Sequence, residues 1–265
     1  MISFTYEQLS GVIATFLFPF ARLLALSMSA PLFGDATVPG TVKIGLAGIV
    51  ALALAPVLGP LPAPAISPFS WEGLWVLAQQ VMIGAALGWC MQIVFSAISM
   101  AGDFVGLQMG LSFATLLTPN SDGSTAVLGM LLNVVAMLVF LATNGHLMMF
   151  ATLVQSFTVL PISAAPLASA GWHYLAMLGG QLFMLALMLS LPLVAALLIC
   201  NLSLGILNRA APQLNIFAVG FPLTLGVGLV VIELMMPRIA PVMDHFIAIG
   251  IDMMIRTTAA FVPSP

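Results

Sequence analysis

The positions of the charged residues divide this chain into long apolar stretches. No Asp, Glu, Lys or Arg occurs in residues 44–71, 73–102, 123–208 or 210–232. A helix needs roughly 20 consecutive apolar residues to cross the hydrocarbon core of a bilayer, and each stretch is long enough. A transmembrane β-barrel would alternate apolar and polar residues over strands of roughly ten residues, and these stretches are continuously apolar. The pattern therefore predicts an all-α, polytopic helical membrane protein.

The apolar runs predict about six helices interrupted by proline and glycine. In the fourth run, residues 143–146 mark a kink, a turn between two spans, or the point where a long helix leaves the bilayer. A turn there would raise the number of spans to seven. After the last run, Asp252 and Arg256 have the i, i+4 spacing that favours an ion pair on a helix. The predicted spans are residues 9–30, 44–58, 75–100, 125–160, 175–206 and 216–236.

Composition excludes several classes of protein. The chain has 265 residues, of which 62% are hydrophobic and 5% charged, with a net charge of -3. Soluble domains are about 25% charged, and disordered chains combine low hydrophobicity with high charge, so neither class fits. Five Lys and Arg residues form no basic patch, which argues against a nucleic-acid partner. Cys90 and Cys200 lie inside apolar runs and have no spacing typical of a disulfide framework or metal site.

No catalytic motif occurs in the sequence. The H-E-x-x-H, G-x-S-x-G and P-loop patterns are absent. The three histidines, His146, His173 and His245, are far apart along the chain. The sequence therefore predicts no enzyme, no metal site and no cofactor.

Polar and small side chains in two predicted spans indicate contact with protein. Arg22 lies near the middle of the first run, where a charge costs roughly 2.5–3.5 kcal/mol on insertion scales. It either snorkels to the membrane interface or contacts a protein interface or cavity. In the third span, small and polar residues recur every four positions and form a ridge that favours close helix packing. The predicted subunit-interface residues are Arg22, Gln80, Gly84, Gly88, Gln92 and Ser96.

Three glycines spaced by four residues, Gly102, Gly106 and Gly110, follow the third span. Irregular backbone is not tolerated against lipid, so this segment must be buried in protein or line a cavity. Two interpretations remain, a tight helix–helix contact and a re-entrant plug. The candidate plug residues are Gly106, Gln108, Met109, Gly110, Leu111, Ser112 and Phe113.

The turn between the last two predicted spans is the third candidate site. Arg209 is the only charged residue in positions 123–232. This segment is either a plain helical-hairpin turn or a docking loop for a partner. Its candidate residues are Asn208, Arg209, Pro212, Gln213 and Asn215.

Separated motifs in a fixed order resemble a known family. They read RLL at 22–24, APLFG at 30–34, GLQMGLSFA at 106–114, NRAAPQLN at 208–215 and GFPLT at 220–224. Together they are similar to the FliR-type export-gate family, which flagellar type III secretion shares with the virulence injectisomes. The wording of the motifs favours the flagellar branch. The Asp122-Gly123-Ser124 loop has no place in the family pattern.

The resemblance implies a multi-pass subunit in the bacterial inner membrane. Such proteins assemble with FliP and FliQ into a closed, helical export gate for unfolded rod, hook and filament subunits, near FlhB and FlhA. Residues 1–174 would resemble a P-type subunit and residues 175–242 a Q-type hairpin, followed by an amphipathic tail at 243–265. Residues 106–113 would form the pore plug, and the Arg209 loop would face the cytoplasmic entrance.

Two other functions fit some of these features. Broken helices and polar groups within the membrane also suit a small-solute secondary transporter. However, the proline-rich stretch at 56–68 and the glycine run at 102–110 have no counterparts in the second half of the chain. A purely structural membrane scaffold would differ from an export gate only in lacking a pore-facing segment. If the polar ridges do contact partner subunits, the chain expressed alone should be unstable in the membrane.

Overall fold

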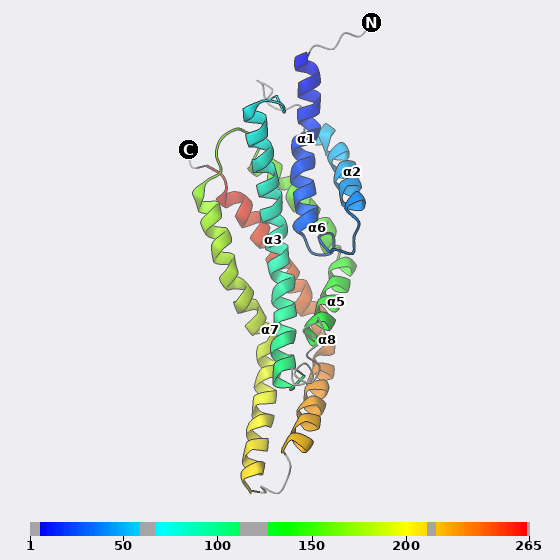
Figure 1. Cartoon of the computed structure of the whole chain (residues 1–265), viewed down its shortest axis with the longest axis vertical. Coiled ribbons are helices and arrows are strands. Elements are labelled where there is room, and N and C mark those ends of the chain that lie inside the picture. Colours follow the sequence, from blue (N-terminus) through cyan, green and yellow to red (C-terminus); the bar gives the residue numbers. More distant parts are fainter. Residues whose placement is uncertain (1–5, 59–66, 112–126, 211–215, 264–265) are drawn as a thin grey trace, which may run out of the picture. The chain divides into compact units, whose positions relative to one another are not determined.

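The computed structural model describes residues 6–58, 67–111, 127–210 and 216–263. Every regular element within these ranges is an α-helix (Figure 1). This confirms the prediction of an all-α membrane protein. The helices are α1 (Tyr6–Ser29), α2 (Gly40–Leu58), α3 (Trp71–Gln108), α5 (Val127–Ala142), α6 (Gly145–Val159), α7 (Ser169–Ala210) and α8 (Ile216–Ala260).

Four of these helices are long and apolar enough to cross a membrane, namely α1, α3, α7 and α8. The number rises to five if the bent pair α5 and α6 counts as one span, and α2 is a shorter apolar helix. Helices therefore occur in each of the six predicted apolar runs, although only four of the described helices are individually long enough to cross a membrane. The predicted tail at 243–256 is the last part of α8, which continues past Pro237 and Pro241.

The break predicted at residues 143–146 separates α5 from α6. Asn144 adopts the left-handed backbone conformation, with φ of 58°. Asparagine tolerates this conformation better than most residues because its short polar side chain can bond locally. The fourth apolar run is thus two helices, joined by a short turn at Thr143 and Asn144.

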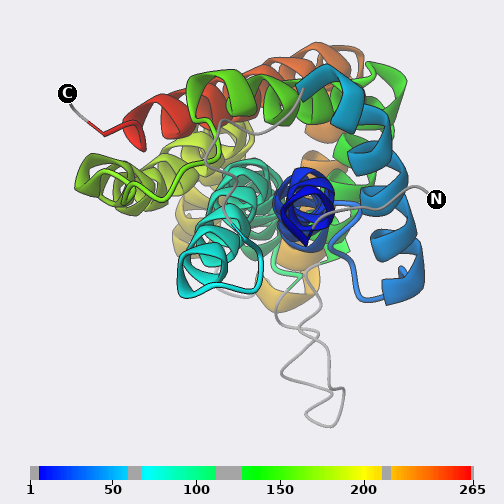
Figure 2. The same ribbon diagram turned by 90° about the horizontal axis from the view of Figure 1, so that it is seen from above.

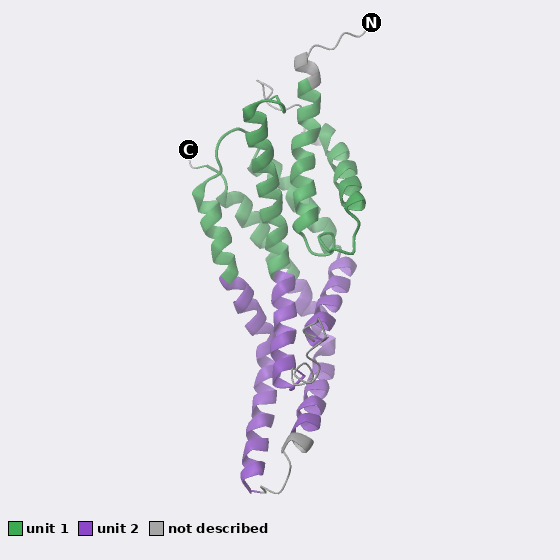
Figure 3. Ribbon diagram, viewed as in Figure 1, with its two compact units in different colours: residues 1–93, 144–179, 247–265 green, residues 94–143, 180–246 purple. Residues whose placement is uncertain are grey.

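The chain forms two compact units, coloured separately in Figure 3. Unit 1 comprises residues 1–93, 144–179 and 247–265, and unit 2 comprises residues 94–143 and 180–246. Helices α3, α7 and α8 each contribute residues to both units.

In unit 1, α1 lies between α2 and the first part of α3 (Figures 1 and 2). Its inward face is fully buried at Phe18, Leu23 and Leu26. The end of α8 docks on the start of α7, because the Ala168 N–H donates to the Phe261 carbonyl over 3.1 Å. The Phe261 ring also packs edge-on against Trp172.

In unit 2, a hydrophobic cluster joins parts of four helices. Val105 comes from α3 and Met109 directly follows that helix, and Leu128, Leu197 and Ile232 come from α5, α7 and α8. Helices α3 and α5 approach so closely that a Cβ on Gly102 would lie 2.5 Å from the Cα of Gly129. Of the two interpretations of the glycine run, tight helix packing therefore holds at Gly102.

Candidate functional site

The guanidinium of Arg22 is the most deeply buried charged group among the described residues. Its side chain has 0% exposure on α1. The Nε donates to Oε1 of Gln80 on α3 over 2.8 Å. From the other end of the fork, Nη1 donates to Oγ of Ser156 over 2.9 Å and Nη2 to the carbonyl of Leu160 over 3.1 Å. One side chain therefore joins α1, α3 and α6.

Dipoles, not a carboxylate, surround this charge. Within the described ranges the only ion pair joins Arg256 and Asp252. The Leu160 carbonyl lies at the C-terminal end of α6, where the helix dipole is negative and favours a cation. The ring of Phe157 lies 4.1 Å from the guanidinium carbon, a cation–π contact. Arg22 therefore does not snorkel, and the polar groups of its own chain stabilise its charge.

The ridge on α3 begins in the same contact. A Cβ on Gly84 would collide with the carbonyl of Arg22 and lie 2.9 Å from Cβ of Ala25. A Cβ on Gly88 would collide with the hydroxyl of Ser29. Close packing of α1 on α3 therefore requires glycine at both positions.

The later members of the ridge are less buried than Gln80, Gly84 and Gly88. Gln92 is exposed and Ser96 is half-buried. Residues four apart on a helix of 3.6 residues per turn are offset by about 40°, so three steps rotate the ridge by about 120°. The role of the ridge at a subunit boundary stays a prediction, and Gln92 is its most exposed member.

The predicted plug segment begins inside α3. Gly106 and Gln108 belong to its last turn, and Met109, Gly110 and Leu111 follow it directly. The Leu111 N–H donates to the Gly106 carbonyl over 3.0 Å, and the Gly110 N–H to the Leu107 carbonyl over 3.1 Å. This pair of bonds is a Schellman motif, which satisfies carbonyls left free at a helix end.

Gly110 makes this cap possible, since its φ of 81° is accessible to glycine and strained for other residues. Met109 is buried, Gln108 is half-buried and Leu107 is 58% exposed. Ser112 and Phe113, the other two predicted plug residues, lie outside the described residues, as does the loop at Asp122.

Met109 packs against α8. The hydroxyl of Thr224 lies 3.2 Å from the Met109 carbonyl oxygen, and a Cβ on Gly228 would lie 2.7 Å from the Met109 thioether. Thr224 and Gly228 are four residues apart, so both face α3. The sequence motif at 220–224 included Thr224, whereas Gly228 was not predicted.

Asp103 is half-buried against α5. A Cβ on Gly129 would collide with its carboxylate, and its Oδ1 has no hydrogen-bond partner among the described residues. The amide oxygen of Asn133, one turn further along α5, is also unpartnered there. Helices α3 and α5 thus each carry one buried acceptor without a donor among the described residues.

Asn208 and Arg209 are exposed in the last turn of α7. A cation at this end of a helix interacts favourably with the helix dipole. The other three candidates of this loop, Pro212, Gln213 and Asn215, lie outside the described residues. Among the residues that are described, no group of three or more His, Cys, Asp or Glu side chains has a geometry suited to a metal ion.

Comparison with known proteins identifies the family. The family model of bacterial export proteins, family 1, matches residues 13–249. A flagellar biosynthetic protein FliR from Pectobacterium carotovorum subsp. carotovorum is 44% identical over 254 residues, which is 96% of this chain and 96% of the relative. The proteins of the same name from Escherichia coli strain K12 and Bacillus subtilis strain 168 are 45% and 29% identical, over 92% and 90% of this chain and 93% and 92% of theirs. The chain therefore belongs to bacterial export protein family 1, together with the FliR proteins that it matches along nearly their whole length.

Proposed function

We propose that this chain is an integral membrane subunit of the flagellar type III protein export gate. In this role it assembles with FliP and FliQ in the bacterial inner membrane, close to FlhA and FlhB. The assembly conducts unfolded flagellar subunits across the membrane. The observation that carries the proposal is the match of residues 13–249 to a family of export proteins, with flagellar biosynthetic proteins covered almost completely.

The surface of α7 and α8 in unit 2 supports a multi-subunit assembly within the membrane. Leu198, Ile199 and Leu202 on α7 are more than half exposed, as are Leu229 and Leu234 on α8. Such side chains require lipid or another apolar surface. This is the face expected of a Q-type hairpin that packs beside further hairpins.

The capped end of α3 supports a pore-facing role for residues 106–111. The chain leaves α3 through Gly110, and the buried Met109 anchors the turn in the cluster of unit 2. Leu107 on the opposite side is exposed. An anchored turn with an exposed apolar flank is suited to closing a narrow channel, since apolar constrictions gate by excluding water.

Co-purification tests the assembly. The tagged chain is expressed with FliP and FliQ, extracted in mild detergent, and the intact complex is weighed by native mass spectrometry. We expect a complex that contains all three proteins, and degraded or aggregated chain when it is expressed alone. A stable monomer with no association to either partner would contradict the proposal.

A cell assay tests the export step. A strain that lacks the chromosomal copy should regain motility and secreted hook protein when this chain is supplied from a plasmid. Normal assembly of the complex without restored motility or secretion would contradict a role of this chain in export.

A further inference from the structure

The hydroxyl of Thr224 faces three carbonyl oxygens at nearly equal distances. Its Oγ1 lies 3.1 Å from the carbonyls of Gly220 and Phe221 on α8, and 3.2 Å from the carbonyl of Met109 after α3. A threonine hydroxyl has one hydrogen to donate. All three distances exceed the roughly 2.7–2.8 Å typical of an O–H···O bond. The hydroxyl therefore lies between the three acceptors and forms a short bond with none of them.

The Met109 carbonyl accepts a hydrogen bond from this hydroxyl. The Schellman bonds satisfy the carbonyls of Gly106 and Leu107, and the Met109 N–H donates to Val105. Within the part of the chain that the structure describes, Thr224 is the donor to the carbonyl of Met109. Thr224 is only 6% exposed, so a missing donor there would leave a buried acceptor unsatisfied.

The two carbonyls of α8 give the hydroxyl a second place to bond. Threonine hydroxyls inside helices commonly donate to the carbonyl three or four residues earlier. If the end of α3 moves away, Thr224 therefore keeps a bonded hydroxyl by turning to Gly220 or Phe221. This change of acceptor costs α8 little free energy, because the hydroxyl stays hydrogen-bonded. The contact with Met109 can therefore open and close reversibly.

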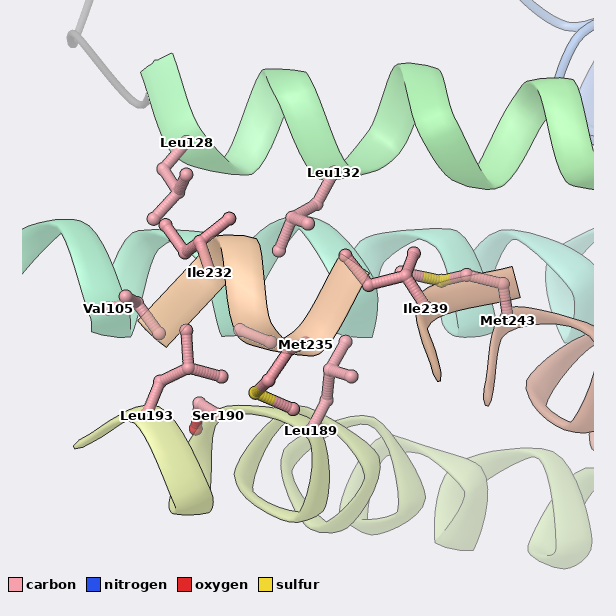
Figure 4. A pocket seen from close by; sticks show the side chains of 11 residues that line it. Val105, Leu128, Leu132, Leu189, Ser190, Leu193, Ile232, Met235, Ile239 and Met243 are labelled. Atoms are coloured by element: carbon pink, nitrogen blue, oxygen red, sulfur yellow. The ribbon is translucent and has the colours of Figure 1, made fainter. Parts of the chain in front are cut away.

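The surrounding packing leaves room for such a movement. A cavity of about 40 Å³ lies among α3, α5, α7 and α8 in unit 2, as Figure 4 shows. It shares Val105, Leu128 and Ile232 with the cluster that holds Met109. Close-packed cores resist displacement, whereas side chains beside a cavity can shift without a collision.

We propose that Thr224 is a positioning residue that, together with Gly228, latches the capped end of α3 onto α8. Residues 106–111 are held by the bond to the Met109 carbonyl and are released when the hydroxyl turns back to its own helix. The latch rests on the proposed function in one respect: its release opens the gate only if residues 106–111 face the pore.

Hydrogen exchange on the complex with FliP and FliQ tests the latch. The amides of Met109, Gly110 and Leu111 report its opening, and the Leu160 amide, which donates to Ser156 in unit 1, reports general loosening. Thr224→Val removes the hydroxyl at constant shape. We expect exchange on the order of ten-fold faster at the first three amides and unchanged exchange at Leu160. Thr224→Ser keeps the donor and should restore slow exchange.

A glycine pair tests the second contact and serves if Thr224→Val does not accumulate. In Gly228→Ala the new Cβ meets the Met109 thioether, whereas at Gly226 on the same helix no atom lies within 4 Å of that position. Gly228→Ala should accelerate exchange at Met109–Leu111, and Gly226→Ala should not. Unchanged exchange in both Thr224→Val and Gly228→Ala overturns the latch, as does equal acceleration at Leu160.

Ion leakage separates the latch from the gate. Cells with Thr224→Val should leak small ions through the export apparatus, and cells with Thr224→Ser should not. Faster exchange with no leak and normal export upholds the latch and overturns the pore-facing role of residues 106–111. A leak from Gly110→Ala together with unchanged exchange in both Thr224→Val and Gly228→Ala upholds the plug and overturns the latch.

Discussion

Arg22 donates a hydrogen bond from its Nε to Oε1 of Gln80, 58 positions further along the chain, with 2.8 Å between the two atoms. Both side chains are almost completely buried. Charged groups inside membrane segments are costly, and such residues usually pair with each other or with backbone carbonyls. The hydrogen-bond partners of Arg22 are a glutamine, a serine and a helix-end carbonyl. Neutral groups, without a carboxylate, therefore offset the free energy that burial of this cation costs.

Replacing Arg22 should destabilise unit 1 strongly. Arg22→Met retains an apolar stem but leaves buried acceptors on Gln80 and Leu160 without donors. Each unsatisfied group costs about 1–3 kcal/mol, so we expect a loss of about 3 kcal/mol and low accumulation in the membrane. Arg22→Lys should rescue poorly, because a lysine cannot reproduce the planar fork. Thermal unfolding of the detergent-solubilised complex measures the loss, with Arg238→Met at an exposed position of α8 as control. Equal melting temperatures for Arg22→Met and wild type would show that the network is not stabilising.

Two glutamines of the α3 ridge should respond differently to the same change. Gln80→Leu removes the acceptor of the Arg22 Nε and should cost about 2 kcal/mol, because a buried charged donor loses its partner. Gln92→Leu lies three ridge steps later, where the side chain is exposed, and should leave the fold intact. Melting temperature and membrane level distinguish the two variants.

The Gln92→Leu variant also tests the predicted subunit interface. If Gln92 contacts a neighbouring subunit, Gln92→Leu should lower the yield of FliP in co-purification while the chain itself accumulates normally. An unchanged yield would restrict the ridge to packing within the chain.

The packing of α1 on α3 should be too close to accommodate even one added methyl group. In Gly84→Ala the new Cβ would collide with the backbone carbonyl of Arg22, which cannot move aside as a side chain can. Overpacking of this kind costs typically about 1–3 kcal/mol. Gly45 on α2 has no atom within 4 Å of the corresponding position, so Gly45→Ala is the matched control. A membrane level of Gly84→Ala equal to that of Gly45→Ala would mean that α1 and α3 are less closely packed than the structure has them.

The helices could be predicted from the sequence because the membrane imposes a strong rule on it. Most of the predicted spans exclude charges over roughly 20 residues, Arg22 in the first span being an exception, and those gaps are visible without any knowledge of packing. The break at Asn144 was also marked, by an Asn-Gly pair within an apolar run. The sequence does not distinguish a kink from a turn there, because a single asparagine can end a helix or bend it.

The partners of Arg22 could not be predicted in this way. Ser156 and Leu160 are 134 and 138 positions away in the chain, and neither has a local signature. The Leu160 carbonyl is available only because α6 ends there. By contrast, the outward turn of the ridge at Gln92 follows from helical geometry, since a four-residue repeat is longer than one turn. Glycines inside apolar runs do not distinguish close contacts from open positions, since Gly228 lies against the Met109 side chain whereas Gly226 has no atom within 4 Å of its Cβ position.

Filling the cavity in unit 2 should stabilise the protein and, if the proposed latch operates, slow export. Val105 lines it from α3, and Val105→Ile adds one methylene while keeping the branched shape. Removing a cavity recovers about 24 cal/mol per Å³, so complete filling of about 40 Å³ would contribute about 1 kcal/mol. Val105→Ala enlarges the same cavity and should lower the stability of the protein. Melting temperature of the complex measures stability, and secreted hook protein measures export. We expect Val105→Ile to melt higher and export more slowly, because the end of α3 then has less room to shift. A higher melting temperature with unchanged export would mean that the end of α3 does not need this space during transport.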